Sequence, residues 1–236
     1  MIDLVNVSRL YHRGADEIHA LERVSLHVER QRFVALMGPS GSGKSTLLNV
    51  LAGLDRPNSG EVTVAGKRLN EMSEDQLAAF RAHTVGFVFQ FFNLIPVLNG
   101  VENVELPLLL TNLGKAERRQ RAETALRIVG LADRGDHRPR ELSGGEQQRV
   151  AIARSIVTDA ELIVADEPTG DLDAKNAEEI LSLLQTLRRD FAKTVVIVTH
   201  DPRAEKWVDE VIHLDKGVLL EKRPGGAARG AAGAAG

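Results

Sequence analysis

Short runs of apolar residues, each ending near a polar residue, recur along the chain. Three of them are wholly apolar or nearly so: 32–37 (RFVALM), 162–165 (LIVA) and 195–198 (VVIV). Continuous apolar runs of this length are typical of parallel strands that are buried on both faces of an α/β sheet. A fourth run, 85–89 (VGFVF), ends at Gln90. The pattern predicts a parallel sheet whose strand ends carry functional side chains.

Alternation of apolar and polar residues marks a second region near the amino terminus. The stretches 2–7, 24–28 and 61–64 each alternate over a few residues. Such alternation is typical of strands with one solvated face. These stretches therefore predict an antiparallel accessory sheet beside the parallel core.

Helical spacing replaces the strand patterns after Gln90. The stretch 115–130 combines this spacing with many acids and bases, and Gly130 suits the position after a helix end. A further amphipathic helix is predicted at 177–189. Residues 224–236 are almost entirely glycine and alanine, which predicts a disordered tail. The expected boundaries within a single domain at 1–223 are a core at about 1–91 and 158–223 and a helical sub-domain at about 92–157.

Composition narrows the classes of protein that fit this pattern. The chain has 236 residues, 43% of them hydrophobic, no cysteine and a formal net charge of −3. A disulfide framework and a cysteine nucleophile are therefore excluded, and the charge gives no reason to expect nucleic acid as a partner. No signal peptide and no membrane span are expected, so the sequence predicts a soluble protein.

A glycine-rich loop follows the apolar run 32–37 and precedes a helical stretch. It matches the pattern G-x-x-x-x-G-K-[ST], in which successive backbone amides point at phosphate oxygens. Lys44 is expected to reach the β- and γ-phosphates, and the Ser45 hydroxyl to ligate Mg²⁺. The loop therefore predicts binding of a nucleoside triphosphate. The expected contacts are Gly38, Pro39, Ser40, Gly41, Ser42, Gly43, Lys44, Ser45 and Thr46.

Polar residues at the ends of the other predicted strands suggest the rest of the site. Adjacent residues of a strand point to opposite sides, so Asp166 is expected to hold the Mg²⁺ shell and Glu167 to polarise the attacking water. His200 is placed to contact the γ-phosphate and hold that water, since α/β sheets bind ligands at the carboxyl ends of strands. Gln90 is expected to reach the metal or the water. Tyr11, the only tyrosine, either stacks on adenine or has an ordinary structural role.

A second glycine pair opens another predicted helix about a hundred residues after the first loop. In LSGGEQQRVAIARS, Ser143, Gly144, Gly145 and Glu146 precede and begin a stretch with helical spacing. Glycines in a first turn cost stability but leave backbone N–H groups free for an anion. The chain therefore predicts two phosphate-binding turns, although a single nucleotide needs only one.

These motifs together resemble the ATPase subunits of ABC transporters. The resemblance covers residues 1 to about 222 and rests on the glycine loop, Gln90, LSGGEQ at 142–147, ADEP at 165–168, GDLD at 170–173 and His200. ALMGPSGSGKSTLLN, GFVFQFFNLIP, ENVELPLL and ADEPTGDLD are similar to the lipoprotein-release and macrolide-export branch (LolD-like, MacB-like). The chain departs from that branch at Asn99-Gly100 and at Ala160, neither of which is expected to touch the nucleotide. The absence of a fused membrane domain in this sequence disfavours the one-chain exporter layout.

The resemblance implies an α/β fold: a P-loop NTPase (RecA-like) core with an antiparallel β sub-domain and an inserted α-helical sub-domain. It also implies a homodimer in which each ATP lies between the Lys44 loop of one subunit and the Ser143 turn of the other, which accounts for the second phosphate-binding turn. Asp173 is implied to lie at the same seam. A C2 dimer makes each of these contacts twice.

The resemblance further implies a membrane permease partner, so the protein is expected on the cytoplasmic face of the inner membrane. The apolar segment 91–98 either packs the helical sub-domain or forms part of a groove for that partner. Lipoprotein release or export of an amphiphilic or peptide substrate is the leading interpretation. The alternative is a regulatory ATPase driving a membrane protein that controls an envelope enzyme. DNA-repair or ribosome-associated relatives and ordinary P-loop kinases fit the motifs less well.

Overall fold

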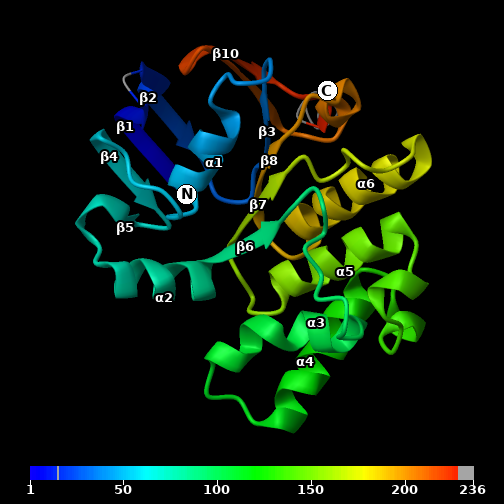
Figure 1. The fold of residues 1–236 in the computed structure, drawn as a ribbon. Coiled ribbons are helices and arrows are strands. Elements are labelled where there is room, and N and C mark those ends of the chain that lie inside the picture. Colours follow the sequence, from blue (N-terminus) through cyan, green and yellow to red (C-terminus); the bar gives the residue numbers. More distant parts are fainter. Residues whose placement is uncertain (15, 228–236) are drawn as a thin grey trace, which may run out of the picture.

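The computed structural model describes residues 1–14 and 16–227, which form two sheets and the helices that cover them (Figure 1). The strands are β1 (Ile2–Arg13), β2 (Asp16–Val28), β3 (Phe33–Met37), β4 (Ser59–Val64), β5 (Lys67–Arg68), β6 (Val85–Val88), β7 (Leu162–Asp166), β8 (Thr194–Val198), β9 (Glu210–Asp215) and β10 (Val218–Pro224). The helices are α1 (Lys44–Leu51), α2 (Glu74–Thr84), α3 (Gly100–Glu105), α4 (Lys115–Ile128), α5 (Gly144–Ile156) and α6 (Ala174–Asp190). Short 3-10 turns lie at Leu69–Glu71, Leu106–Leu110, Ala132–Arg134, Pro139–Glu141 and Pro202–Lys206.

The larger sheet has the strand order β10-β9-β3-β8-β7-β6. Strands β9, β3, β8, β7 and β6 are parallel, and β10 pairs with β9 in the antiparallel direction. The four apolar runs predicted as parallel strands correspond to β3, β6, β7 and β8. Their carboxyl ends meet at one edge of the sheet, where the residues that follow them can act together.

Successive residues of the central strands contribute to two different hydrophobic cores. In β3, Phe33 and Ala35 pack with α5 and α6, whereas Val34 and Leu36 pack with α1 and the smaller sheet. This alternation follows from the two-residue period of a strand. Because both faces are covered, the central strands carry almost no polar residues, as the pattern of the sequence predicted.

The smaller sheet is antiparallel, with the order β2-β1-β4-β5, and lies over α1 on one face of the larger sheet (Figure 1). Asp3 of β1 pairs with His27 of β2 on one side and with Thr63 of β4 on the other. The predicted accessory sheet is therefore present. Its first two strands are longer than expected and form a hairpin that extends to residues 13 and 16.

Helices α3, α4 and α5 pack together below the larger sheet, within the range predicted for the helical sub-domain (Figure 1). Asn99 caps α3 through reciprocal hydrogen bonds with Glu102. Gly130 follows α4 with φ 78°, the left-handed conformation expected of a residue just beyond a helix end. In the part of the chain that the structure describes, no helix is both long enough and apolar enough to span a bilayer.

Two features at the carboxyl end differ from the expectations. Strands β9 and β10 were not predicted, because charged residues interrupt their apolar ones. The disordered tail was expected from residue 224, but Pro224 closes β10, and the amides of Gly225 and Ala227 donate to the carbonyls of Asp209 and Val208 at 2.8 and 3.2 Å. The expectation is wrong for 224–227 because these backbone bonds attach the segment to the core. Residues 228–236 lie outside the described residues.

Candidate functional site

The glycine-rich loop joins the end of β3 to the start of α1. Gly43 is the residue before α1 and has φ 97°, and a Cβ atom there would lie 2.2 Å from the carbonyl oxygen of Ala20. Only glycine fits this combination of conformation and close approach. No side chain caps the start of α1. Its first N–H groups are therefore available to an anion.

Lys44 folds back over the loop. Its ammonium group donates to the carbonyl oxygens of Gly38 and Pro39 at 2.9 and 2.8 Å, and the side chain is largely buried. The ammonium also donates to Ser42 Oγ at 3.5 Å, so all three partners are neutral and leave the charge of the buried ammonium uncompensated. The arrangement therefore suits a phosphate, which supplies negative charge to the centre of the loop.

Asp166 is the last residue of β7 and Glu167 follows it, and the two make different contacts, as expected of adjacent residues. Ser45 Oγ donates to Asp166 Oδ1 at 3.2 Å. Burial raises the pKa of Asp166, and the neighbouring charge of Glu167 adds to this effect, against the hydrogen bond from Ser45. A bound cation would offset that cost of burial. Glu167 has φ 47°, which turns it away from the strand direction toward β8.

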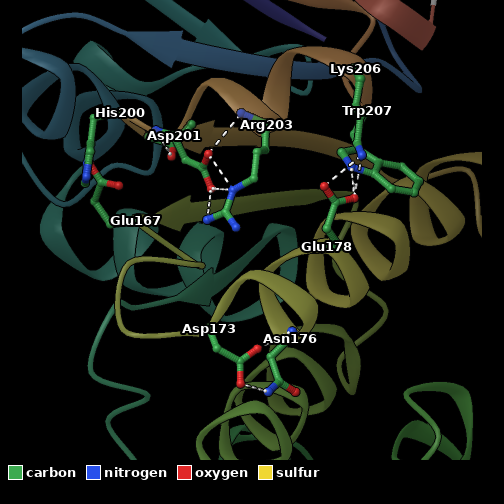
Figure 2. A network of polar contacts seen from close by, with 10 residues as sticks. Glu167, Asp173, Asn176, Glu178, His200, Asp201, Arg203, Lys206 and Trp207 are labelled. Atoms are coloured by element: carbon green, nitrogen blue, oxygen red, sulfur yellow. Dashed lines mark hydrogen bonds and ion pairs between the residues drawn. The ribbon is translucent and has the colours of Figure 1, made fainter.

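His200 follows β8 and contacts Glu167. Its Nδ1 lies 2.9 Å from Glu167 Oε1, and Figure 2 shows the imidazole beside the carboxylate. Glu167 Oε2 is buried and has no hydrogen-bond partner among the described residues. One carboxylate oxygen is thus oriented by the histidine, and the other remains able to accept a proton from a water molecule.

These residues line one cavity of about 770 Å³, a volume typical of nucleotide and cofactor sites. Its lining is Tyr11, Ile18, His19, Ala20, Gly38, Pro39, Ser40, Gly41, Ser42, Gly43, Lys44, Ser45, Thr46, Asp166, Glu167, Val198 and His200. Residues 18–20 and Val198 were not among the contacts predicted from the sequence. The three residues of β2 reach the cavity through the β1–β2 hairpin, and no local motif signals that approach.

The oxygen ligands in this cavity fit Mg²⁺. Ser45 and Asp166 converge at the start of α1 with a hydroxyl and a carboxylate. No group of three or more His, Cys, Asp or Glu side chains capable of holding a metal occurs among residues 1–14 and 16–227. Mg²⁺ is commonly bound by one or two protein oxygens together with substrate phosphates and water. The site therefore fits a metal that enters with the nucleotide.

Tyr11 lies at the side of this cavity, where it was expected to meet a base. Its hydroxyl donates to Asp55, and the guanidinium carbon of Arg9 lies 4.5 Å from the centre of its ring. Its stacking on adenine stays a prediction. Asp55 and Arg9 were not identified from the sequence, because neither belongs to a motif.

Gln90 lies outside the lining of the cavity. A Cβ atom on Gly170 would lie 3.1 Å from Gln90 Nε2, so the amide packs on the loop that follows Glu167. Its expected contact with the metal or the water stays a prediction. The position places Gln90 against the loop that follows Glu167.

The second glycine turn forms the start of α5 and does not reach the cavity. Ser143 Oγ accepts the N–H of Glu146 at 3.3 Å, and Glu146 Oε2 accepts the N–H and Oγ–H of Ser143 at 2.8 and 2.9 Å. A Cβ atom on Gly145 would lie 2.3 Å from Asn176 Oδ1, so glycine permits close packing on α6. None of the residues 143–146 lines the cavity of Lys44.

Asp173, expected at the dimer seam, is the N-cap of α6. Its carboxylate accepts the backbone N–H of Asn176 at 2.8 Å and the side-chain amide of Asn176 at 2.9 Å (Figure 2). The backbone hydrogen bond from Asn176 lowers the pKa of Asp173. Through Asn176, the loop after Glu167 therefore contacts the glycine turn at the start of α5.

The comparisons with known proteins agree with this geometry. The ABC transporter family model matches residues 21–170. An uncharacterized ABC transporter ATP-binding protein of Methanocaldococcus jannaschii, MJ0796, is 47% identical over 92% of this chain and 94% of its own length. The lipoprotein-releasing system ATP-binding protein LolD of Chromohalobacter salexigens is 46% identical, over 94% of this chain and 93% of that protein. The macrolide export ATP-binding/permease protein MacB of Chlorobaculum tepidum is 46% identical. The match spans 94% of this chain but only 34% of that longer protein.

A solved structure gives the same result in three dimensions. The dimeric post-hydrolysis state of the cassette MJ0796 bound to ADP and Pi superposes with a TM-score of 0.87 and 43% identity, covering 95% of this chain and 98% of that one. Together the matches confirm the predicted α/β fold and the resemblance to the LolD and MacB branch. They also confirm the assignment as an ATPase that uses ATP and Mg²⁺. The chain belongs to the ABC transporter family.

Proposed function

We propose that this chain is the ATP-hydrolysing subunit of a transporter whose separate membrane subunit releases lipoproteins or exports an amphiphilic or peptide substrate. The proposal places it at the cytoplasmic face of the inner membrane, attached through that partner. Its main support is the half-buried Glu167 carboxylate beside His200, in the same cavity as the Lys44 loop. The similarity to LolD over 93% of that protein favours a subunit that works with a separate permease.

In this proposal the chain binds the triphosphate through the loop after β3. The free amides at the start of α1 and the ammonium of Lys44 contact the β- and γ-phosphates. Ser45 and Asp166 hold Mg²⁺, which when bound neutralises charge on the phosphate oxygens. The partners of Lys44 within the loop are two carbonyls and the Ser42 hydroxyl, so phosphate binding exchanges neutral partners for charged ones.

Hydrolysis depends on the contact between Glu167 and His200. Glu167 Oε2 accepts a proton from the attacking water, since its other oxygen is engaged by the imidazole. His200 fixes the direction of the carboxylate. Water then attacks the γ-phosphorus, the bond to the bridging oxygen breaks, and ADP and phosphate are formed.

A second copy of the chain completes the site in this proposal. Ser143, Gly144, Gly145 and Glu146 lie outside the cavity of their own chain, so they are available to the nucleotide of another. The related MJ0796 cassette is dimeric in its post-hydrolysis state with ADP and Pi bound. ATP would thus join two chains, and its hydrolysis would release them.

The surface that fits the membrane subunit is a groove between the larger sheet and the helical sub-domain. Its volume is about 510 Å³, and the rings of Phe87 and Phe89 stack in it with centroids 5.9 Å apart. Leu54 and Leu110 at its edges are 51% and 77% exposed, which is unusual for leucine. The groove is lined by Leu54, Ala78, Arg81, Ala82, Val85, Gly86, Phe87, Phe89, Asn93, Pro107, Leu110, Arg154, Ser155 and Thr158.

The groove lies beside the segment 91–98 rather than on it, because Asn93 alone of that segment is among its lining residues. Phe91 and Val97 are nevertheless 72% and 73% exposed. Arg154 donates to the carbonyls of Phe92 and Asn93 at 2.7 and 2.6 Å. Ile95 is exposed as well. The segment therefore packs on α5 through its backbone and leaves apolar side chains exposed, which is compatible with both interpretations that the sequence left open.

The test is ATPase activity with and without the membrane subunit, co-expressed and purified with this chain. Leu110→Lys is expected to keep the basal ATPase rate and to lose stimulation by the partner. Leu220→Lys, at a 65% exposed position on β10, is the matched control and is expected to keep both. Equal stimulation of both variants would contradict the groove as the docking surface. Absence of basal ATPase activity in the parent chain would contradict the proposed activity itself.

A further inference from the structure

The Tyr11 ring is held from one side by a charged cluster. Arg9 and Tyr11 are two residues apart on β1, so their side chains leave the strand on the same face. Asp55 reaches them from the turn after α1. The guanidinium carbon of Arg9 lies 4.5 Å from the ring centre, within the range of a cation–π contact. The ring has a second face, and Tyr11 is part of the lining of the nucleotide cavity.

Asp55 connects the members of this cluster. Its Oδ2 accepts the Tyr11 hydroxyl and Arg9 Nε, the latter at 2.9 Å. Its Oδ1 accepts the backbone N–H of Arg56 at 2.8 Å and pairs with Arg9 Nη2 at 2.8 Å. Both carboxylate oxygens are therefore used, and the orientation of the carboxylate is fixed by four contacts.

The charge of Arg9 is stabilised where it lies. Burial acts against that charge, but the contacts with Tyr11 and Asp55 outweigh it, and the pKa of Arg9 lies above its usual value. Arg9 Nη1 also donates to the side-chain oxygen of Asn58 at 3.3 Å. The guanidinium thus has partners on several sides, which restricts its movement off the ring.

We propose that Arg9 and Asp55 are positioning residues for the base of the nucleotide. They fix the ring of Tyr11 so that the face opposite Arg9 is presented to the base before the nucleotide binds. The base is then stacked as the third layer of a guanidinium–phenol–base arrangement. This inference rests on the proposed function, since it requires that the Lys44 loop holds the phosphates.

Fixing the ring in advance strengthens binding because less conformational freedom is lost when the base arrives. Immobilising one side chain on binding costs about 0.5–1.5 kcal/mol. At about 1.4 kcal/mol for each tenfold change, this corresponds to a two- to tenfold change in Kd. The effect is confined to ligands that carry a base, because Arg9 and Asp55 are absent from the lining of the cavity.

The experiment compares Kd for Mg²⁺–ADP and Mg²⁺–pyrophosphate by calorimetry on the full chain. Arg9→Gln and Asp55→Asn are expected to raise the Kd for ADP by about two- to tenfold and to leave that for pyrophosphate unchanged. Tyr11→Phe keeps the ring but loses the bond to Asp55, and is expected to behave like Asp55→Asn. Arg68→Gln, which breaks an ion pair of 3.1 Å with Glu71 elsewhere on the smaller sheet, is the control and is expected to change neither value.

A double substitution separates positioning from a general structural effect. In a Tyr11→Ala background, Arg9→Gln is expected to have no further effect on the Kd for ADP. A further effect there, or an equal rise for ADP and pyrophosphate, would overturn the inference. If the parent chain binds ADP no more tightly than pyrophosphate, the inference is also overturned, whereas the proposed phosphate site stands. Failure of the parent chain to bind either ligand would instead overturn the proposed function.

Discussion

Helices α1 and α5 both begin on glycine-rich turns, but they differ in whether a side chain of the same chain accepts hydrogen bonds from their first amide groups. The start of α1 has the left-handed Gly43 and no capping side chain. The start of α5 has a complete capping box between Ser143 and Glu146. Both have the positive end of a helix dipole, but at α5 the amides of Ser143 and Glu146 have side-chain acceptors in the same chain, whereas no side chain caps α1. The start of α1 is therefore open to an anion, and the start of α5 is partly closed by Ser143 and Glu146.

The closed turn also carries a negative charge. The backbone N–H of Ser143 lowers the pKa of Glu146, with smaller help from the Ser143 hydroxyl and Arg134, so the carboxylate is ionised at neutral pH. A phosphate that approaches this turn competes with Glu146 for the Ser143 hydroxyl. We therefore expect the α1 turn to determine nucleotide affinity in the single chain, and the α5 turn to act only in an assembled dimer.

The largest expected effect comes from the open turn. Lys44→Ala removes the only ammonium that lines the cavity within the described residues. We expect the Kd for ATP to rise by more than about 100-fold, since the charge-assisted bonds to the phosphates are lost. Calorimetry with the single chain measures this. Ser143→Ala is the matched variant at the closed turn, and a comparable loss of affinity there would refute the distinction between the turns.

Glu167, the carboxylate proposed as the base, should separate binding from turnover. Glu167→Gln keeps the shape of the side chain and its contact with His200 but removes the base, so kcat is expected to fall by about 10²–10⁴-fold. The affinity for ATP should remain. Because ATP then persists, size-exclusion chromatography with Mg²⁺–ATP should show a stable dimer, in which both turns contact one nucleotide. Normal turnover by this variant would remove Glu167 from the catalytic role.

Mixed dimers test whether the closed turn serves a second chain. Ser143→Ala and Lys44→Ala chains each give homodimers in which every site is damaged. A mixed dimer contains one intact site, formed by Lys44 of one chain and Ser143 of the other. Random pairing at equal amounts makes about half of the dimers mixed, so about a quarter of the parental sites are restored. ATPase assays of the mixture measure this, and activity equal to the mean of the separate variants would contradict the shared site.

The contrast between the two turns also shows what the sequence can predict. Gly38–Thr46, Asp166, Glu167 and His200 lie in contiguous motifs at strand ends, and the topology of a parallel sheet brings strand ends together. Their convergence was therefore predictable. The capping box between Ser143 and Glu146 was equally readable from the S-x-x-E spacing, although only an anion-binding role was predicted for this turn.

Features that depend on the meeting of distant segments were not predictable. Asp55 reaches Tyr11 across 44 positions, and the packing of Gly145 on Asn176 needs the relative placement of α5 and α6. Strand β9 was missed because His213 and Glu210 interrupt its apolar pattern. It lies in the sheet because its backbone pairs with β3, and no side-chain periodicity records that pairing.

The smallest expected effect concerns the charge at the closed turn. Glu146→Gln keeps a side chain that can complete the capping box but removes the carboxylate. At pH 7 the variant should be less stable by about 0.3–1 kcal/mol, the usual contribution of an acid at a partly solvated helix start. The pKa of Glu146 is lowered by folding, so this contribution is present above the unfolded value of about 4.5 and is lost as the pH falls through the folded value. Denaturant unfolding at pH 7 and near pH 3, at equal ionic strength, measures the difference in the free energy of unfolding between the parent chain and Glu146→Gln. If ATP dimerises Glu146→Gln more readily than the parent chain, the carboxylate of Glu146 opposes the incoming phosphate. Unchanged dimerisation would mean that breaking the hydrogen bond between Ser143 and Glu146 does not weaken the dimer.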